Sequence, residues 1–429
     1  MIRKHLPAVL LCGLLTALAL PAILLDIRLD TGVAADSVQV HVPQMNLFVA
    51  DPFAPLDHKA YVASIPLYHM AFAAAARAMG IGTIEHGMTG LRLLNGGLGL
   101  LLILCAVRLL GRTEDPLRPL LLLPLTVSWF TVQSTAYFGT DVAGLLMLAL
   151  FLLAVRSGLA GRGLAGRGAA GLAMVGTRHL LAPTLFAPTL ARAFTRDGRR
   201  FSPRETAAEL LPALALLAVH AVAWGGLVPP GITPDMNAAG LFPAAGLHAL
   251  AYLGVMAFIF GPVRAADLRR FLGGAQTRRL VIAALAAGAV VWLAVPSSFD
   301  PAAGRWGSVV WSIARYSPSL LDRSLPLLPL VLAGALLAAY VLETCRRMGG
   351  MPLEIAALLC CLGGLVFVSP AYQRYPEPVA LLTLALFFGR LPSPESGPDR
   401  GRAPAIGYLP LLLFSAAYIA ADAAKLYLS

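Results

Sequence analysis

The feature that most constrains this chain is a series of long apolar runs that recur from one end of the sequence to the other. The first of them, residues 6–25, contains no charged residue. A helix of roughly 20 apolar residues crosses a hydrocarbon core about 30 Å thick. Hydrophobic residues make up 58% of the chain and charged residues only 13%, whereas a soluble domain carries roughly 25% charged residues. The sequence therefore predicts an all-α polytopic membrane protein and excludes a water-soluble enzyme.

Charged and Pro/Gly-rich breakers divide the chain into about thirteen predicted transmembrane helices. Two of these are a pair of short helices within 168–194. We treat 1–429 as a single transmembrane domain. The predicted spans are 6–27, 88–110, 119–135, 140–156, the pair within 168–194, 207–226, 241–262, 280–296, 325–343, 353–369, 376–390 and 404–421.

Two segments allow more than one interpretation. Residues 1–22 resemble a signal peptide, but the apolar run continues to Leu25 before Asp26, which favours an uncleaved first helix. Residues 158–167 repeat Gly-Leu-Ala-Gly-Arg in tandem. This repeat is too short to be a structural repeat, and we interpret it as a basic flexible linker.

The basic residues predict the orientation. If the N-terminus is cytoplasmic and the loops alternate, most of the 33 Lys and Arg residues lie on the cytoplasmic side. A span at 60–80 would reverse every later loop, so we interpret it as a helix in the outer interface, with Tyr61, Tyr68 and His69 at head-group depth. The first external loop, 28–87, then carries interfacial helices. The net charge of +11 reflects cytoplasmic loops rather than nucleic-acid binding, and the excess of Arg over Lys favours a bacterial inner membrane.

Polar residues gather on the predicted outer side. Any one of them can simply be solvated, but charge at the edge of a membrane is costly and often functional, so the group is a candidate site. The histidines of the first loop lack the close spacing of a metal site, and we predict neither a metal nor a cofactor. Arg178 lies in an apolar run and must face a cavity, an anion or a partner; Asp141 is the structural partner that the sequence offers.

Several outer motifs resemble the eukaryotic dolichyl-phosphoglucose-dependent α-1,2-glucosyltransferase family. That family has His-x-Pro-Gln, Asp-Pro, Pro-Gly-Leu-Tyr, Leu-Arg-Phe-x-Asn, Tyr-Tyr-Thr-Asp/Glu, Gly-Gly-Ile-Val and Arg-Tyr followed by Pro, in this order. The corresponding stretches here are His41-Val42-Pro43-Gln44, Asp51-Pro52, Ile65-Pro66-Leu67-Tyr68, Leu91-Arg92-Leu93-Leu94-Asn95, Tyr137-Phe138-Gly139-Thr140-Asp141, Gly225-Gly226-Leu227-Val228 and Arg374-Tyr375 with Pro378.

The resemblance implies a GT-C polytopic glycosyltransferase fold. The chain departs from the family where an Asp-Glu pair precedes the histidine, because Ser37 and Val38 stand there and the nearest acid is Asp36. The family's Arg-Gln-Thr-Asn is replaced by Val175-Gly176-Thr177-Arg178. The resemblance therefore implies the fold more strongly than the same sugar or acceptor.

These residues predict transfer of a sugar from a polyprenyl-phosphate carrier to a hydroxyl of a lipid-linked or glycan acceptor at the outer face. An external carboxylate would accept the hydroxyl proton, and arginine would bind the departing lipid phosphate. The candidate catalytic residues are Asp36, first, and then Asp57 and Asp141. The candidate substrate-binding residues are His41, Gln44, Tyr68, His69, Arg178, His179, Asp322, Arg323, Arg374 and Tyr375.

Two other classes of membrane protein remain open. A multi-span transporter or lipid flippase would also have many spans, but transporters tend to show two related halves with charges near the midplane. Here the charges gather at one face and no half-to-half repeat is visible. A structural membrane subunit would tolerate replacement of the external acids.

Overall fold

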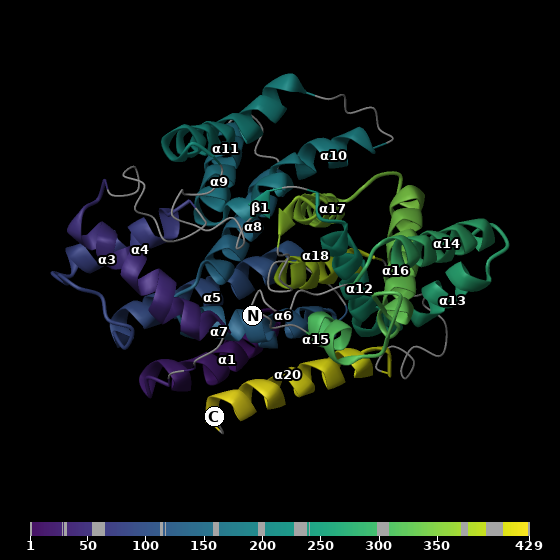
Figure 1. Cartoon of the computed structure of the whole chain (residues 1–429), viewed down its shortest axis with the longest axis horizontal. Coiled ribbons are helices and arrows are strands. Elements are labelled where there is room, and N and C mark those ends of the chain that lie inside the picture. Colours follow the sequence, from purple (N-terminus) through teal and green to yellow (C-terminus); the bar gives the residue numbers. More distant parts are fainter. Residues whose placement is uncertain are drawn as a thin grey trace.

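The computed structural model describes residues 2–27, 29, 32–53, 65–111, 115, 117–157, 163–195, 202–226, 238–239, 241–297, 309–369, 376–391 and 406–427. Three of the sequence-predicted site residues, Asp57, Arg374 and Tyr375, lie outside this part of the chain. The described part is almost entirely helical (Figure 1), which confirms the all-α class.

The first half of the chain contains α1 (Ile2–Leu24), α2 (Gly32–Asp36), the π-helical turn η1 (Ser37–His41), α3 (Val42–Ala50), α4 (Leu67–Ala78), α5 (Thr89–Leu110), the 3-10 helix η3 (Arg118–Leu122), α6 (Leu123–Val127), α7 (Trp129–Ala136), α8 (Thr140–Arg156), α9 (Gly163–Thr177), the 3-10 helix η4 (His179–Phe186) and α10 (Ala187–Ala193). The second half contains α11 (Pro203–Trp224), α12 (Pro243–Phe260), the 3-10 helix η6 (Gly261–Arg264), α13 (Ala265–Gly273), α14 (Arg278–Ala294), α15 (Val309–Tyr316), α16 (Leu327–Arg347), α17 (Leu353–Leu365), α18 (Pro376–Arg390) and α20 (Leu409–Tyr427).

Strands are confined to two short antiparallel pairs in the described residues. β1 (Ala238–Ala239) pairs with β4 (Val368–Ser369), with Ala238 opposite Ser369. β2 (Ser319–Leu320) pairs with β3 (Arg323–Ser324) as a hairpin, with Leu320 opposite Arg323. Both pairs connect helix ends and do not form a core sheet.

The helix count differs from the prediction. Among the described residues, five helices are long and apolar enough to cross a membrane, and the bent pair α7–α8 would make a sixth. The count of thirteen is therefore not confirmed. The reason is that several predicted spans are short or interrupted: 119–135 is broken at Ser128, and 353–369 contains a helix of only 13 residues. Such helices are shorter than the roughly 20 residues that a complete span requires.

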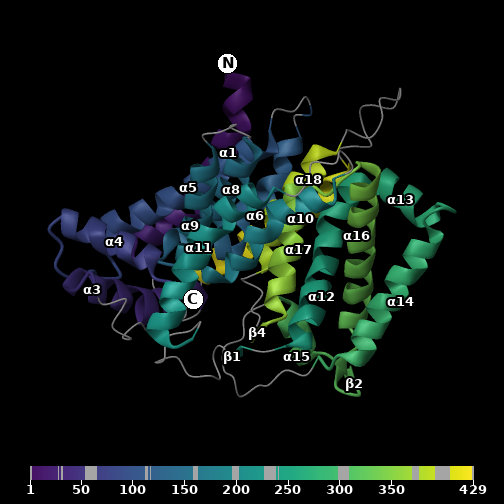
Figure 2. The same cartoon turned by 90° about the horizontal axis from the view of Figure 1, so that it is seen from above.

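The helix ends gather at two ends of the bundle. One, the loop end, contains the end of α1 and the start of α5, where Arg92 donates to the carbonyl of Ala22. The other, the arginine end, contains the end of α8, where Arg156 donates to the carbonyl of Leu109 on α5. In Figure 2, the strand pairs and α15 lie at the lower ends of α12, α14 and α16, and α13 lies at their upper ends. This arrangement agrees with loops that alternate between two sides.

Close approach of backbones explains several glycines in the helices. Gly254 on α12 lies against the carbonyl of Leu330 on α16, and Gly334 on α16 lies against the carbonyl of Leu250 on α12, so that a Cβ at either glycine would clash with main-chain atoms. Small residues at such crossings allow helices in membranes to pack by van der Waals contact. The α12–α16 pair is therefore set by this reciprocal glycine contact.

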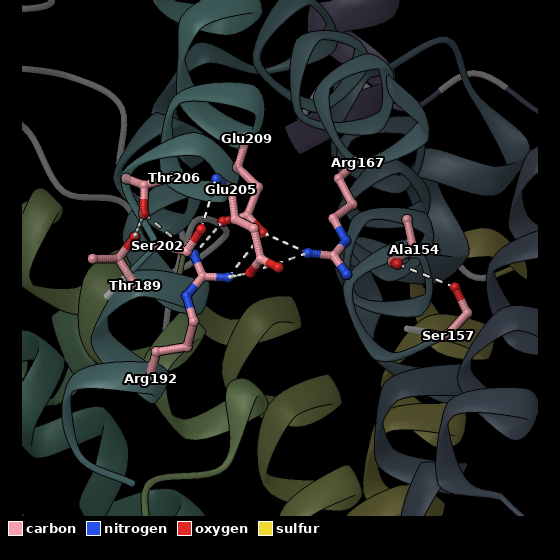
Figure 3. Close-up of polar contacts among 9 residues, drawn as sticks. All are labelled: Ala154, Ser157, Arg167, Thr189, Arg192, Ser202, Glu205, Thr206 and Glu209. Atoms are coloured by element: carbon pink, nitrogen blue, oxygen red, sulfur yellow. Dashed lines mark hydrogen bonds and ion pairs between the residues drawn. The ribbon is translucent and has the colours of Figure 1, made fainter. Parts of the chain in front are cut away.

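At the arginine end, four charged side chains join α9, α10 and α11 (Figure 3). The fully buried carboxylate of Glu209 accepts hydrogen bonds from Nη2 of Arg192 at 2.6 Å and from Nη1 of Arg167 at 3.2 Å. Glu205 adds a second contact to Arg192 at 3.1 Å. Arg167 was predicted to belong to a flexible linker, and that prediction is wrong for residues 163–167, because they form the first turn of α9 and are held by this network. Residues 158–162 lie outside the described part.

The start of α11 shows why its helix begins there. Ser202 accepts a hydrogen bond from the backbone N–H of Glu205, and Pro203 occupies the first turn. A serine cap followed by an acid three residues later satisfies free N–H groups at a helix start. The helix ends at Gly225, whose φ of 68° is left-handed and favours glycine. The Ser202 cap and the charge network thus both stabilise the N-terminal end of α11.

Candidate functional site

The site is built around a break in the chain between α7 and α8. The two helices are bent by 107° with respect to each other. Tyr137, Phe138 and Gly139 connect them; Tyr137 and Gly139 are extended, and the side chains of Tyr137 and Phe138 are fully buried. Buried backbone groups outside a helix need partners. The break is therefore stable only if neighbouring side chains hydrogen-bond to its backbone groups.

Three elements of the loop end supply these partners. The N–H of Phe138 donates to Oγ of Ser37 at 3.2 Å, and the N–H of Gly139 donates to the hydroxyl of Tyr68 at 3.1 Å. Nδ2 of Asn95 donates to the carbonyl of Tyr137 at 2.9 Å. The first external loop and the start of α5 thus supply hydrogen-bond partners to the backbone groups of the break.

Tyr68 and Asn95 are also bonded to each other. The Tyr68 hydroxyl donates to Oδ1 of Asn95 at 2.9 Å while it accepts from Gly139. Burial raises the pKa of Tyr68 well above its ordinary value, and the charge of Asp141 adds to the rise. The hydroxyl therefore keeps its proton, which it needs as the donor to Asn95.

His41 and His69 form a buried pair beside Tyr68. Nδ1 of His41 lies 2.9 Å from Nε2 of His69, and the two rings are stacked with centroids 5.1 Å apart. Burial lowers the pKa of His69 well below its ordinary value, and repulsion from His41 adds to this effect. A hydrogen bond between two imidazoles requires a proton on one nitrogen and a lone pair on the other. The pair therefore exists only while at least one ring is neutral.

The head-group depth expected for Tyr68 and His69 stays a prediction, but neither side chain faces outward as on an interfacial helix. Both side chains are buried, His69 completely. The reason is that one face of α4 packs on α3, where Phe72 and Ala76 join Met45 in a small apolar cluster. With 12 residues, α4 is about 18 Å long, too short for a span. Tyr61 lies outside the described residues.

Arg178 is bound to Asp141. Its Nη1 lies 2.5 Å from Oδ1 of Asp141 and donates to the Thr140 hydroxyl at 2.8 Å. Asp141 stands in the first turn of α8, where the helix dipole favours a negative charge. Gly144, one turn later on α8, leaves the space that Arg178 occupies, since a Cβ there would lie 2.9 Å from Cβ of Arg178. The structural partner that the sequence offered is thus the one that Arg178 has.

Sequence reasoning missed Asp26 and treated Arg92 only as part of a motif. Arg92 is fully buried and donates from Nη1 to Asp26 at 2.8 Å and from Nε to the carbonyl of Ala136 at 3.0 Å. Its guanidinium also lies 5.1 Å from the ring centroid of Tyr137. Asp26 has a left-handed φ of 46° and a side chain that is 36% exposed. The signal in the sequence was its place as the first acid after the first apolar run.

Asp36 lies where α2 meets η1, one residue before Ser37. It is half-buried, and α2 packs against α7, where the N–H of Val33 donates to Oε1 of Gln133 at 3.1 Å. Gln44, on α3, is fully buried. The structure therefore brings Asp36, His41, Tyr68, His69, Asp141 and Arg178 to the loop end, around the α7–α8 break, and it places Gln44 on the neighbouring helix α3.

The other predicted residues lie elsewhere. His179 begins η4, next to Arg178. Asp322 and Arg323 belong to the β2–β3 hairpin, which in Figure 2 lies laterally far from α3 and α4, below α14 and α16. These two residues are not part of the cluster around the break.

A second polar contact occurs at the break between α6 and α7. Ser128 donates to Oε1 of Glu377 at 3.0 Å, and the hydroxyl of Tyr418 donates to the same oxygen at 2.8 Å. Glu377 is fully buried at the start of α18. At both breaks in the 118–140 segment, polar side chains from other helices thus make hydrogen bonds to residues of the break.

Within the described residues, no group of three or more His, Cys, Asp or Glu side chains is arranged to hold a metal ion. No protein-family model matches the chain, and neither a characterised protein nor a solved structure is significantly similar to it. The functional argument therefore depends on the geometry of the loop end and on the motifs described above.

Proposed function

We propose that the protein is a membrane glycosyltransferase that uses a polyprenyl-phosphate-linked sugar. It transfers the sugar to a hydroxyl of a lipid-linked or glycan acceptor at the outer face of the membrane, which we expect to be a bacterial inner membrane. The observation that supports this proposal is that four separate motifs of the resemblance meet at one place. Tyr68, Asn95 and Gly139 are joined by hydrogen bonds, and His41 lies against Tyr68.

The reaction needs a carboxylate that can reach the acceptor. The acceptor oxygen attacks the anomeric carbon, the bond from that carbon to the phosphate oxygen breaks, and the hydroxyl proton passes to the base. The polyprenyl phosphate leaves with the electron pair of the broken bond. Such a base contributes roughly 10²–10⁴ in rate. Asp141 is poorly suited to this role because Arg178 holds its buried carboxylate.

We assign the role of base to Asp36. It is half-buried and directly precedes Ser37, whose hydroxyl accepts from the N–H of Phe138 in the break. Asp26 is partly exposed, but Arg92 fixes one of its oxygens, which suits it to orient an acceptor hydroxyl instead. Arg374, from its place in the sequence, would bind the departing phosphate with a bidentate guanidinium.

The experiment measures release of polyprenyl phosphate by the purified protein in lipid nanodiscs. A panel of polyprenyl-phosphate sugars is tested with and without membrane lipid and glycan acceptors. We expect turnover of one donor in the presence of acceptor. If every donor stays intact while the protein moves one of them across a vesicle membrane, the proposal is wrong and the transporter class is right.

The residue test compares Asp36→Asn with Asp51→Asn. Asp51 is an exposed acid on the same loop, and within the described residues its carboxylate accepts from the nearby N–H of Phe53. We expect Asp36→Asn to lower turnover by about 10²–10⁴ with unchanged donor binding, and Asp51→Asn to have no effect. Equal turnover of the two variants, or loss only with Asp26→Asn, would remove Asp36 from the chemistry.

A further inference from the structure

The β2–β3 hairpin, between α15 and α16, combines a tightly held stem with an exposed apolar tip. Leu320 is 56% exposed and Leu321 is 76% exposed, and Tyr316, at the end of α15, is 77% exposed. None of these side chains takes part in the apolar clusters of the described residues. The tip thus presents apolar surface away from the protein.

The stem is fixed to the end of α14. Ser297 donates from its N–H to the carbonyl of Asp322 at 3.0 Å and accepts from the N–H of Ser324 at 2.6 Å. Trp292 Nε1 donates to the carbonyl of Ser324 at 2.9 Å, and Arg323 Nε donates to the carbonyl of Leu293 at 2.6 Å. Ser324 and Trp292 are buried. The tip is therefore presented by a rigid support.

The turn itself holds a residue that is unfavourable there. Leu321 and Asp322 have φ values of 51° and 59°, which is the geometry of a two-residue hairpin turn that favours Asn and Gly. A bulky side chain in the left-handed region is strained. In water, an exposed leucine would gain nothing in return for this strain. Burial of its side chain in another phase would offset the strain.

We propose that this hairpin and the end of α15 insert into the lipid head-group layer of the leaflet next to the loop end. The tip is only a few residues from the start of α16, a candidate span. At about 3.3 Å per residue, the six residue steps from Leu321 to Leu327 reach at most roughly 20 Å, so the tip lies within reach of the head-group layer, which is about 5–8 Å thick. A lipid surface is therefore the partner within reach.

The charges agree with this depth. Arg315 is exposed beside Tyr316, and its guanidinium lies 5.1 Å from the Tyr316 ring centroid. Tyrosine, tryptophan and arginine are typical of the membrane interface, and arginine attracts anionic head groups. Asp322 is exposed at the tip, and the cost of burying its charge keeps the tip out of the hydrocarbon core. The hairpin is thus placed among head groups and not below them.

The test uses the natural protein in nanodiscs that contain phospholipids with a photoreactive diazirine in the head group. Trypsin cleaves after Arg315 and Arg323, so peptide 316–323 reports on the hairpin alone. We expect this peptide to carry the lipid label and to be poorly labelled by a water-soluble diazirine. The reverse pattern would overturn the proposal, and so would cross-links from this peptide to a second copy of the chain or to another protein.

A matched variant carries Leu320→Asn and Leu321→Asn. Asparagine tolerates the left-handed turn, so the hairpin keeps its geometry and loses only its apolar side chains. We expect lipid labelling of the peptide to fall on the order of tenfold, since two leucine side chains no longer partition into the interface. Unchanged lipid labelling in a variant that elutes like the natural protein on gel filtration would contradict the proposal. The labelling of the natural protein decides independently if the variant fails to fold.

Discussion

At the arginine end, Glu209, Glu354 and Glu343 are each held by two guanidinium groups. At the loop end, the buried side chains of Ser37, Tyr68 and Asn95 instead bind backbone groups of the broken segment between α7 and α8. The first arrangement pairs buried carboxylates with arginine and, at Glu209 and Glu354, clamps different helices together, whereas Glu343 is paired within its own helix, α16. The second holds a non-helical segment in place and leaves the Asp26 side chain partly exposed. Polar side chains can thus serve either to fasten a membrane bundle or to shape a site within it.

The largest expected effect concerns which end faces outward. Asp51→Cys and Gln276→Cys place a thiol at an exposed position near the loop end and on the α13–α14 turn of the arginine end, respectively. If the basic residues set the orientation, a membrane-impermeant thiol reagent should label Asp51→Cys in intact spheroplasts and Gln276→Cys only after lysis, with the natural protein as the blank. The opposite pattern would place the proposed site in the cytoplasm.

The next prediction tests the clamp at the arginine end. Glu209→Ala leaves Arg167 and Arg192 without their buried carboxylate, and we expect the free energy of unfolding to fall by about 3–5 kcal/mol. Glu205 is the matched control, because its side chain is 41% exposed, and its replacement by Ala should cost about 0–1 kcal/mol. Unfolding in mixed micelles measures both. Equal losses would mean that burial of Glu209 does not set the strength of the clamp.

The smallest expected effect is the pH dependence of the histidine pair at the loop end. Because the pKa of His69 is lower in the folded protein than the ordinary value of 6.5, the unfolded chain binds more protons at acidic pH. The stability from this group is complete above pH 6.5 and decreases as the pH falls below that value, by at most about 1.4 kcal/mol per pH unit.

The His69→Gln variant keeps a hydrogen-bonding side chain without a titrating ring. Its stability should depend less on pH between 7 and 5 than that of the natural protein. Other buried histidines contribute equally to both proteins, so the comparison isolates the pair. Parallel curves of melting temperature against pH would show that the pair does not titrate with unfolding.

Much of the helix arrangement could be predicted from apolar runs alone. The predicted spans 140–156 and 376–390 have the same bounds as α8 and α18, and Arg156 and Arg390 mark the ends of the two apolar stretches. The gap between the predicted spans 119–135 and 140–156 coincides with the α7–α8 break, but the interruption at Ser128 and the burial of both breaks were not predicted. Ser128 and Gly139 lie in apolar surroundings, and only contacts with Glu377 and Tyr68, which are distant in sequence, make a break possible there.

The candidate site was predicted in part. The motifs identified His41, Tyr68 and Asp141, and the structure brings them to one end of the bundle. The pairing of Arg178 with Asp141 was foreseen as an alternative, since both lie at the predicted outer ends of helices. The Asp26–Arg92 pair was missed because an acid directly after an apolar run looks like a solvated helix end, and a single sequence does not show that Arg92 is buried beside it.

The α7–α8 break also has a consequence for how the chain is made. Synthesis proceeds from the N-terminus, so Ser37, Tyr68 and Asn95 leave the ribosome before Phe138 and Gly139. Unpaired backbone groups cost several kcal/mol each in hydrocarbon. The first external loop has therefore already been synthesised, with its Ser37 and Tyr68 hydroxyls able to accept from the break, when the bent pair enters the membrane. An N-terminal truncation that removes this loop should leave the pair badly inserted and exposed to membrane proteases.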